Sequence, residues 1–272
     1  MRNALVISLT VLAVALAGTA REYFAPQAPA PAQSGPQEVQ PASPGARTPP
    51  PLETPPGPVP LRVVVLDPAH GGADLGARGT GGLRESDLVL DYAGQIRAAL
   101  ERDGWHILLT RQGNEDPSFD ERSAMANGQR GAVFISLHVG STGLPGTVRV
   151  YTIPDPSFGL AGGAPGAPAG LIPWEQAQAP FLNLSRKLAD LAQGELALQF
   201  RGSPNAAQTA AVRQLRTVAA PAIAIEISSV TKEEESDLER MGPGLAACVE
   251  RALTAFRPFY DASPIAPPGG TR

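Results

Sequence analysis

The sequence predicts an α/β fold, with a single domain whose mostly parallel twisted sheet is flanked by helices on both faces. Residues 61–66 are apolar apart from Arg62, a run typical of a strand buried on both faces. Residues 86–102 read as a helix, because apolar side chains recur every four positions from Leu88 to Leu100. Strand-like and helix-like segments keep alternating down the chain, and this alternation is typical of a parallel sheet covered on both sides.

The remaining elements follow in order along the chain. Further strands are expected at residues 105–110, 132–137, 147–152 and 222–227. Further helices are expected at residues 121–129, from about 174 or 181 to 199, and from about 233 to 256. Residues 154–180 are rich in Pro, Gly and Ala and are too long for an ordinary connection in a compact domain, so a surface insertion is expected there.

Composition limits the classes of protein to which the chain can belong. With 272 residues it can hold one or two domains, and a formal net charge of −4 argues against a nucleic-acid surface, which is usually basic. Cys248 is the only cysteine, so no internal disulfide can form. Its place on the apolar side of a helical pattern favours a buried hydrophobic role over a nucleophile. We expect a monomer without a nucleic-acid partner.

The N-terminal part reads as an export segment followed by a spacer. A charged start, an apolar run over residues 4–17 and small residues at 18–20 follow the order of a secretory signal. Residues 4–20, a stretch of about 17 residues, are also at the lower limit for crossing a bilayer, so residues 1–22 are expected to be a signal peptide or an N-terminal membrane anchor. Residues 23–60 read as a Pro-rich disordered tether, residues 61–262 as the folded domain and residues 263–272 as a flexible tail.

Three of the expected strands carry a residue that an apolar strand rarely tolerates. The first strand runs into Asp67–Gly72, which contains His70. The third strand runs into His138, and the strand at 222–227 contains Glu226. In open α/β sheets the functional crevice lies beyond the carboxyl ends of the strands. Residues that are far apart in the sequence are therefore expected to meet at that edge.

Glu226 needs a partner wherever it is buried. An unpaired carboxylate among apolar side chains costs several kcal/mol even after relaxation. One solution is a cation or a metal-activated water molecule beside the carboxylate. The other solutions are a salt bridge to one of the arginines, or a strand end that protrudes into solvent. The pattern alone favours none of these.

Two of the three histidines, His70 and His138, are candidate metal ligands. Zinc binds imidazole nitrogens and carboxylate oxygens, and a catalytic zinc site usually has three protein ligands. Glu85, at the start of the first helix, is the natural carboxylate. From the pattern alone Glu85 also fits a helix N-terminal acid, and the histidines also fit hydrogen-bonded strand ends. The third histidine, His106, is expected to face solvent or a backbone carbonyl.

Six motifs, in order and spacing, resemble those of the zinc-dependent N-acetylmuramoyl-L-alanine amidases, which split peptidoglycan. The motifs are DPAHGG (67–72), ESDLVLD (85–91), ILLTR (107–111), RSAMAN (122–127), ISLHV (135–139) and PAIAIE (221–226). The resemblance covers about residues 61–260. It implies that Arg111, Arg122 and Asn127 are structural residues that tie the strand-end loops together.

The resemblance also implies the chemistry of the site. His70, Glu85 and His138 correspond to the family's metal ligands, with one Zn²⁺ per chain, and Glu226 matches the catalytic glutamate. The implied reaction is hydrolysis of the amide between N-acetylmuramic acid and L-alanine of the stem peptide, with Glu226 as general base. The implied location is the periplasm, or a membrane anchor facing the cell wall, and the need for an activator protein stays open.

Three segments next to these residues depart from the family pattern. Ala69 replaces a Gly, Val139–Ser141 replaces the usual Ala-Asn or Ala-Asp, and Ile227–Ser229 replaces the usual Gly-Phe. No departure removes a ligand, but each could alter activity or substrate choice. One alternative is therefore a non-catalytic wall-binding or regulatory protein that keeps the fold. A second alternative is a zinc peptidase that acts on another amide.

Overall fold

The described part of the chain begins just before the first strand. The computed structural model describes residues 59–155 and 173–264. All of them belong to the unit Glu53–Arg272. The expected export segment lies outside the described residues, as do nearly all of the tether, most of the insertion and most of the C-terminal tail. No helix in the two described ranges has the length and apolarity needed to cross a membrane.

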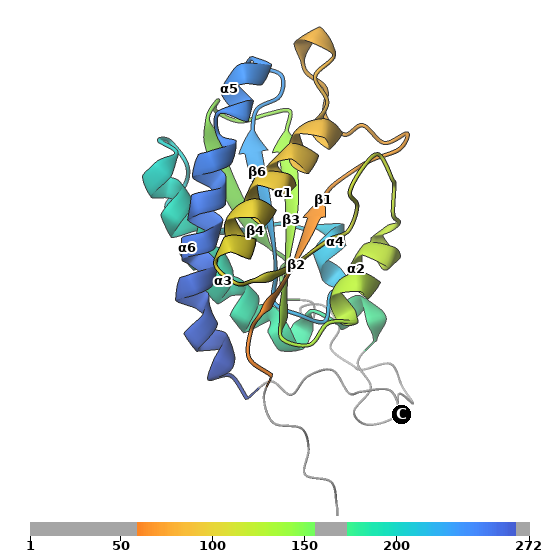
Figure 1. The fold of residues 1–272 in the computed structure, drawn as a ribbon, viewed down its shortest axis with the longest axis vertical. Coiled ribbons are helices and arrows are strands. Elements are labelled where there is room, and N and C mark those ends of the chain that lie inside the picture. Colours follow the sequence, from red (N-terminus) through yellow and green to blue (C-terminus); the bar gives the residue numbers. More distant parts are fainter. Residues whose placement is uncertain (1–58, 156–172, 265–272) are drawn as a thin grey trace, which may run out of the picture. The chain divides into compact units, whose positions relative to one another are not determined.

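One six-stranded sheet forms the centre of the domain, with the strand order β2-β1-β3-β6-β4-β5 (Figure 1). The strands are β1 (Val63–Pro68), β2 (His106–Leu109), β3 (Ala132–Gly140), β4 (Thr147–Thr152), β5 (Gln208–Thr209) and β6 (Ala222–Ser228). Strands β2, β1, β3 and β6 are parallel, β4 runs antiparallel to β6, and the short β5 pairs in parallel with β4. The mostly parallel sheet predicted from the sequence is confirmed.

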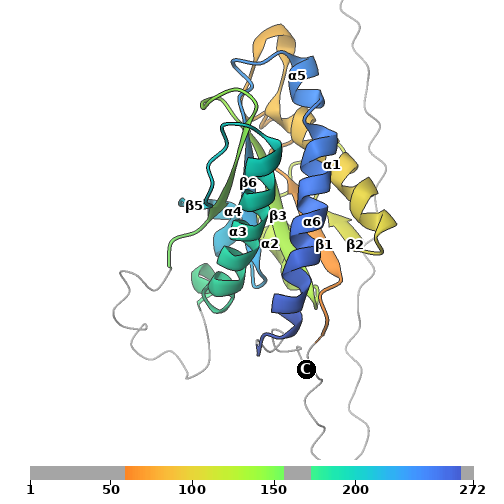
Figure 2. The same ribbon diagram turned by 90° about the vertical axis from the view of Figure 1, so that its left-hand side faces the viewer.

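Helices cover both faces of this sheet. They are α1 (Glu85–Arg102), α2 (Phe119–Asn127), α3 (Leu182–Gln199), α4 (Arg213–Arg216), α5 (Glu235–Glu239) and α6 (Gly242–Asp261), with short 3-10 turns at Thr80–Gly82, Trp174–Gln176 and Ala179–Phe181. Helices α1 and α3 contact the sheet, and α6 packs against both of them, as Figure 2 shows. Helices α2 and α4 contact each other and the strands through a second, smaller core. The two cores explain why β1, β3 and β6 are apolar along nearly their whole length.

The last helix and the third strand differ from the sequence-based expectation. The single helix expected from about 233 to 256 is two helices, α5 and α6, and α6 begins only at Gly242. Pro243 explains the late start, because proline has no N–H to donate and is favoured in the first turn of a helix. Strand β3 continues to Gly140 instead of ending at residue 137, so His138 lies within the strand.

A buried carboxylate joins the ends of several elements. Asp67, at the end of β1, is fully buried and pairs with Arg122 of α2, with 2.7 Å between Oδ1 and Nη1. The hydroxyls of Thr110 and Ser136 donate to its two oxygens at 2.6 and 2.8 Å. These four side chains come from β1, α2, β3 and the residue after β2. The buried charge is therefore both paired and hydrogen-bonded, as its burial requires.

Two other motif residues also hold loops in place, as predicted. Arg111 is buried and donates to the carbonyl oxygens of Pro68, Ala69, Ser86 and Gly113. Asn127 bridges the loop before β6, where its amide donates to Thr217 O and its carbonyl accepts from the N–H of Ala219. The structural role expected for Arg111, Arg122 and Asn127 is confirmed.

We expect Arg122→Met to lower the free energy of unfolding by about 3 to 5 kcal/mol, because it leaves the buried Asp67 carboxylate without its cation. Urea unfolding of the full chain measures the loss. Arg97→Met is the matched control, because it breaks the exposed ion pair with Glu101 on α1 and should cost about 1 kcal/mol or less. Equal losses in the two variants would contradict the stabilising role of the buried pair.

Candidate metal centre and catalytic site

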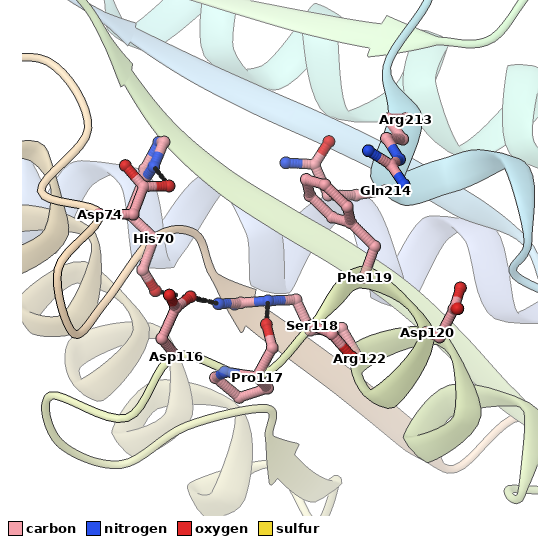
Figure 3. A pocket seen from close by; sticks show the side chains of 10 residues that line it. All are labelled: His70, Asp74, Asp116, Pro117, Ser118, Phe119, Asp120, Arg122, Arg213 and Gln214. Carbon is pink, nitrogen blue, oxygen red and sulfur yellow. Dashed lines mark hydrogen bonds and ion pairs between the residues drawn. The ribbon is translucent and has the colours of Figure 1, made fainter.

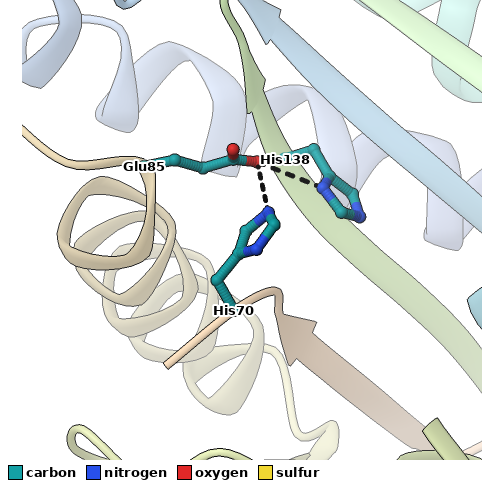
Figure 4. Close-up of side chains that lie close together, drawn as sticks. All are labelled: His70, Glu85 and His138. Atoms are coloured by element: carbon teal, nitrogen blue, oxygen red, sulfur yellow. Dashed lines mark hydrogen bonds and ion pairs between the residues drawn. The ribbon is translucent and has the colours of Figure 1, made fainter. Parts of the chain in front are cut away.

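Three side chains from three elements converge at the carboxyl edge of the sheet (Figure 4). His70 lies in the loop after β1, Glu85 is the first residue of α1, and His138 lies on β3. Glu85 Oε1 lies 3.1 Å from His70 Nε2 and 3.1 Å from His138 Nδ1. The structure thus brings together the three residues that the sequence suggested as metal ligands.

The backbone around His70 is shaped to place its ring. His70 has a φ of 64°, a left-handed conformation that costs energy for a residue with a Cβ and is found mainly where the surroundings enforce it. Arg122 Nη2 donates to His70 O at 3.0 Å and holds the loop in this conformation. Gly76 lets the loop pass close to the cluster, because a Cβ there would lie 2.5 Å from Glu85 Oε2 and 2.7 Å from His70 Cδ2. The hydrogen bond from Arg122 and the close approach of Gly76 therefore restrict the position of the His70 ring from two sides.

Each histidine has a second polar partner, which lies at the ring nitrogen that does not contact Glu85. His70 Nδ1 donates to Asp74 Oδ2 at 2.8 Å. The other ring nitrogen of His138, Nε2, lies 3.3 Å from Ser136 Oγ, which itself donates to Asp67. Metal-binding histidines almost always have such an outer partner, because it fixes the tautomer and the ring orientation. The cluster thus has the ligand groups and also their supports.

Charges within the cluster are strongly coupled. Burial acts to raise the pKa of Glu85, but hydrogen bonds from His138, His70 and the Ala77 N–H outweigh it and hold that pKa well below its usual range. Burial acts to lower the pKa of His70, but the hydrogen bonds and charges of Glu85 and Asp74 outweigh it and raise that pKa to about 9. In the metal-free protein at neutral pH, an ionised Glu85 therefore lies beside a protonated His70.

The donor set fits a divalent metal ion. Its three donor atoms all lie within 4.8 Å of one another. Ligands held at about 2.0 to 2.2 Å around a tetrahedral ion would be roughly 3.4 Å apart, close to the 3.1 Å contacts of Glu85 Oε1. Two imidazoles and one carboxylate leave a fourth position open in tetrahedral coordination, as catalytic sites require.

Glu226 lies on β6 directly opposite His138 on β3 in the parallel register. Its side chain is 31% exposed, so the carboxylate is at the surface of the site. Arg149 Nη1 lies 3.3 Å from Glu226 Oε1, and the Tyr151 hydroxyl lies 3.5 Å from the same oxygen. The sequence left several kinds of partner open for Glu226, and the structure shows one of them, a salt bridge to an arginine.

Two cavities open beside the cluster. One of about 380 Å³ is lined by His70, Asp74, Asp116, Pro117, Ser118, Phe119, Asp120, Arg122, Arg213 and Gln214 (Figure 3). The other, of about 290 Å³, is lined by His138, Tyr151, Ala210, Val212, Gln214, Ala224 and Glu226. Gln214 lines both cavities, and its amide lies 3.3 Å from His138 Nε2. A substrate could therefore approach the cluster from two sides.

His106 is exposed on the edge strand β2, away from the cluster, and Cys248 is buried in the main core. Sequence reasoning did not identify Asp74, Arg149 or Gln214. Only Asp74 carried a usable signal, because it lies four residues after His70 in the same loop.

The fold and the cluster together define an α/β protein in which two histidines and a glutamate form a candidate metal centre. Residues 64–242 match the family model Amidase_3, N-acetylmuramoyl-L-alanine amidase, and the chain belongs to this family. The family resemblance found in the sequence is confirmed.

Similar proteins include other proteins named as N-acetylmuramoyl-L-alanine amidases. The amidase AmiA of Escherichia coli K12 is 40% identical over 77 residues, which are 28% of this chain and 27% of that protein. The sporulation-specific amidase of Bacillus subtilis 168 is 38% identical over 94 residues, which are 34% of this chain and 36% of that protein. The chain thus covers little more than a third of these relatives at most.

Solved structures show the same fold. The amidase AmiC2 of Nostoc punctiforme superposes with a TM-score of 0.56 at 24% identity, over 74% of this chain and 98% of that one. The CwlD amidase of Clostridioides difficile, solved in complex with the GerS lipoprotein, gives a TM-score of 0.54 at 18% identity, over 72% of this chain and 98% of that one.

We expect zinc binding at pH 7 to release close to one proton, because the pKa of about 9 keeps His70 protonated in the metal-free protein and a metal ligand must be neutral imidazole. Zinc affinity should therefore increase as the pH rises toward about 9. Titration calorimetry of the full chain in buffers with different ionisation enthalpies measures the released protons. His106→Ala should behave like wild type, and heats that do not depend on the buffer would contradict the prediction.

Proposed function

We propose that this protein is a zinc-dependent N-acetylmuramoyl-L-alanine amidase, which hydrolyses the amide between the lactyl group of N-acetylmuramic acid and L-alanine of the stem peptide. The observation that supports this proposal most is the convergence of His70, Glu85 and His138 beside Glu226 in a chain of this family. The products are a denuded glycan and a free stem peptide.

Each residue of the site has a distinct part in the proposed reaction. His70, Glu85 and His138 would hold Zn²⁺, which when bound supplies Lewis-acid activation of water and of the scissile carbonyl. Glu226 takes the proton of the attacking water and later delivers a proton to the leaving amine. Because Glu226 lies outside the three-ligand cluster, its carboxylate stays available for proton transfer.

The two rival functions are less well supported. A non-catalytic wall-binding protein would not need the complete ligand cluster with its outer partners Asp74 and Ser136. A zinc peptidase with another substrate is opposed by the family membership.

We also propose that the chain is exported, that it works in the periplasm or at the membrane facing the wall, and that it is a monomer. The similar CwlD amidase was solved in complex with the GerS lipoprotein, and this complex is a reason to test whether a partner protein activates the present chain.

Release of stem peptides from purified sacculi tests the proposal. The full chain should carry close to one zinc and release stem peptides, and a chelator should stop the release. His70→Ala and His138→Ala should each lose most of the zinc, whereas His106→Ala should keep it. A zinc-loaded protein that releases no peptide supports the non-catalytic rival, and cleavage of other peptides alone supports the peptidase.

Replacing the two glutamates separately distinguishes base from ligand. We expect Glu226→Gln to keep zinc and to lose about two to four orders of magnitude in hydrolysis, because glutamine preserves shape but removes the basic carboxylate. Glu85→Gln should instead lose zinc, because a neutral amide is the poorer ligand. Zinc content and hydrolysis of a muramoyl peptide are measured for both. Loss of zinc in Glu226→Gln with retention in Glu85→Gln would reverse the assigned roles.

A further inference from the structure

One oxygen of the Glu226 carboxylate is held from the neighbouring strand. Arg149 and Tyr151 of β4 both approach Oε1, at 3.3 and 3.5 Å, because β4 runs antiparallel beside β6 and places Arg149 opposite Glu226. Within the described residues, the hydrogen bonds and the ion pair of this carboxylate go to Oε1. The second oxygen, Oε2, is left for other partners.

The guanidinium that makes this contact is itself held. Arg149 Nη1 donates to Ser228 Oγ at 3.0 Å, and Ser228 lies on β6 two residues after Glu226. Gly143 packs close to the same group, because a Cβ there would lie 2.8 Å from Nη1 and Nη2. The side chain of Arg149 is only 20% exposed. An arginine fixed in this way loses little further rotamer entropy when it holds a carboxylate.

Two of the segments that depart from the family pattern meet at this contact. Gly140 and Ser228 belong to them, at the ends of β3 and β6, and they pair with each other in the sheet register. A Cβ at Gly140 would lie 3.1 Å from Glu226 Cδ and 3.3 Å from Oε1, so any larger residue there would push the carboxylate. Gly140 makes room for the carboxylate where it now lies, and Ser228 holds the arginine that binds it.

We propose that Arg149 is a positioning residue of the amidase reaction, which anchors Glu226 Oε1 so that Oε2 is presented to the attacking water. This inference rests on the proposed function. A charge-assisted hydrogen bond restricts the carboxylate more strongly than a neutral one. General-base catalysis depends on such restriction, because misplacement by about 1 Å can cost on the order of 100-fold in rate.

A double-mutant cycle on the zinc-loaded full chain tests the inference. We expect Arg149→Met to lower kcat for a muramoyl peptide by about 10- to 100-fold, with zinc content and KM unchanged. Arg149→Lys should recover part of the loss, because it keeps a cation near Oε1. In the Glu226→Gln background, Arg149→Met should cause no further loss. Arg97→Met, which removes an exposed arginine from α1, is the control and should keep wild-type kcat.

Three results would overturn the inference. One is an unchanged kcat in Arg149→Met, and another is an equal further loss in the Glu226→Gln background. The third is a raised KM at constant kcat, which would mean that Arg149 binds substrate.

Crystal structures of wild type and Arg149→Met provide a readout that does not need activity. The Glu226 carboxylate should occupy one position in wild type and should move or spread in the variant. If wild type is inactive but the carboxylate is released in Arg149→Met, the proposed function fails and the positioning contact stands. If the carboxylate keeps its place in the variant, the positioning inference fails whatever the activity.

Discussion

The buried carboxylate of Asp67 is the constraint on which the site geometry depends. It is fully buried at the end of β1, where Arg122, Thr110 and Ser136 all donate to it. Arg122 also donates to the carbonyl oxygen of His70, the residue with the left-handed backbone conformation. Through Ser136, Asp67 is linked to the outer nitrogen of His138 as well. One buried ion pair thus connects the folding of four elements to the orientation of both histidine rings.

Much of the fold could be predicted because most strands and helices have a periodic pattern of apolar residues. Such a pattern can be recognised from the residues of the element itself. The apolar runs of β1 and β6 and the four-residue repeat of α1 are of this kind. The break between α5 and α6 was missed, because the apolar period continues across Met241 and Gly242 while the backbone needs a new start there. Strand β3 is longer than the sequence predicts, because the polar His138 and the flexible Gly140 weaken the local strand pattern while pairing with β6 continues to Gly140.

The candidate ligands His70, Glu85 and His138 follow from the family resemblance of the motifs that contain them, and the structure brings the three side chains together. Glu226 follows from the same resemblance, but its partner Arg149 does not. Arg149 lies on β4 in an alternating pattern that fits any half-exposed strand. Only the antiparallel pairing of β4 with β6 turns Arg149 and Tyr151 toward the carboxylate. A pattern along one strand contains no information about which strand lies beside it.

The site divides into a part held by the sheet and a part held by a loop. His138 and Glu226 lie side by side on the neighbouring strands β3 and β6, so strand pairing fixes the distance between their backbones. His70 and Glu85 depend instead on the loop after β1 and on the start of α1. The contact with Glu85 contributes to the raised pKa of His70, so the two residues of the loop half are coupled by charge as well as by position. A metal ion bound there would replace a proton in a cluster whose histidine rings already contact Asp74 and Ser136.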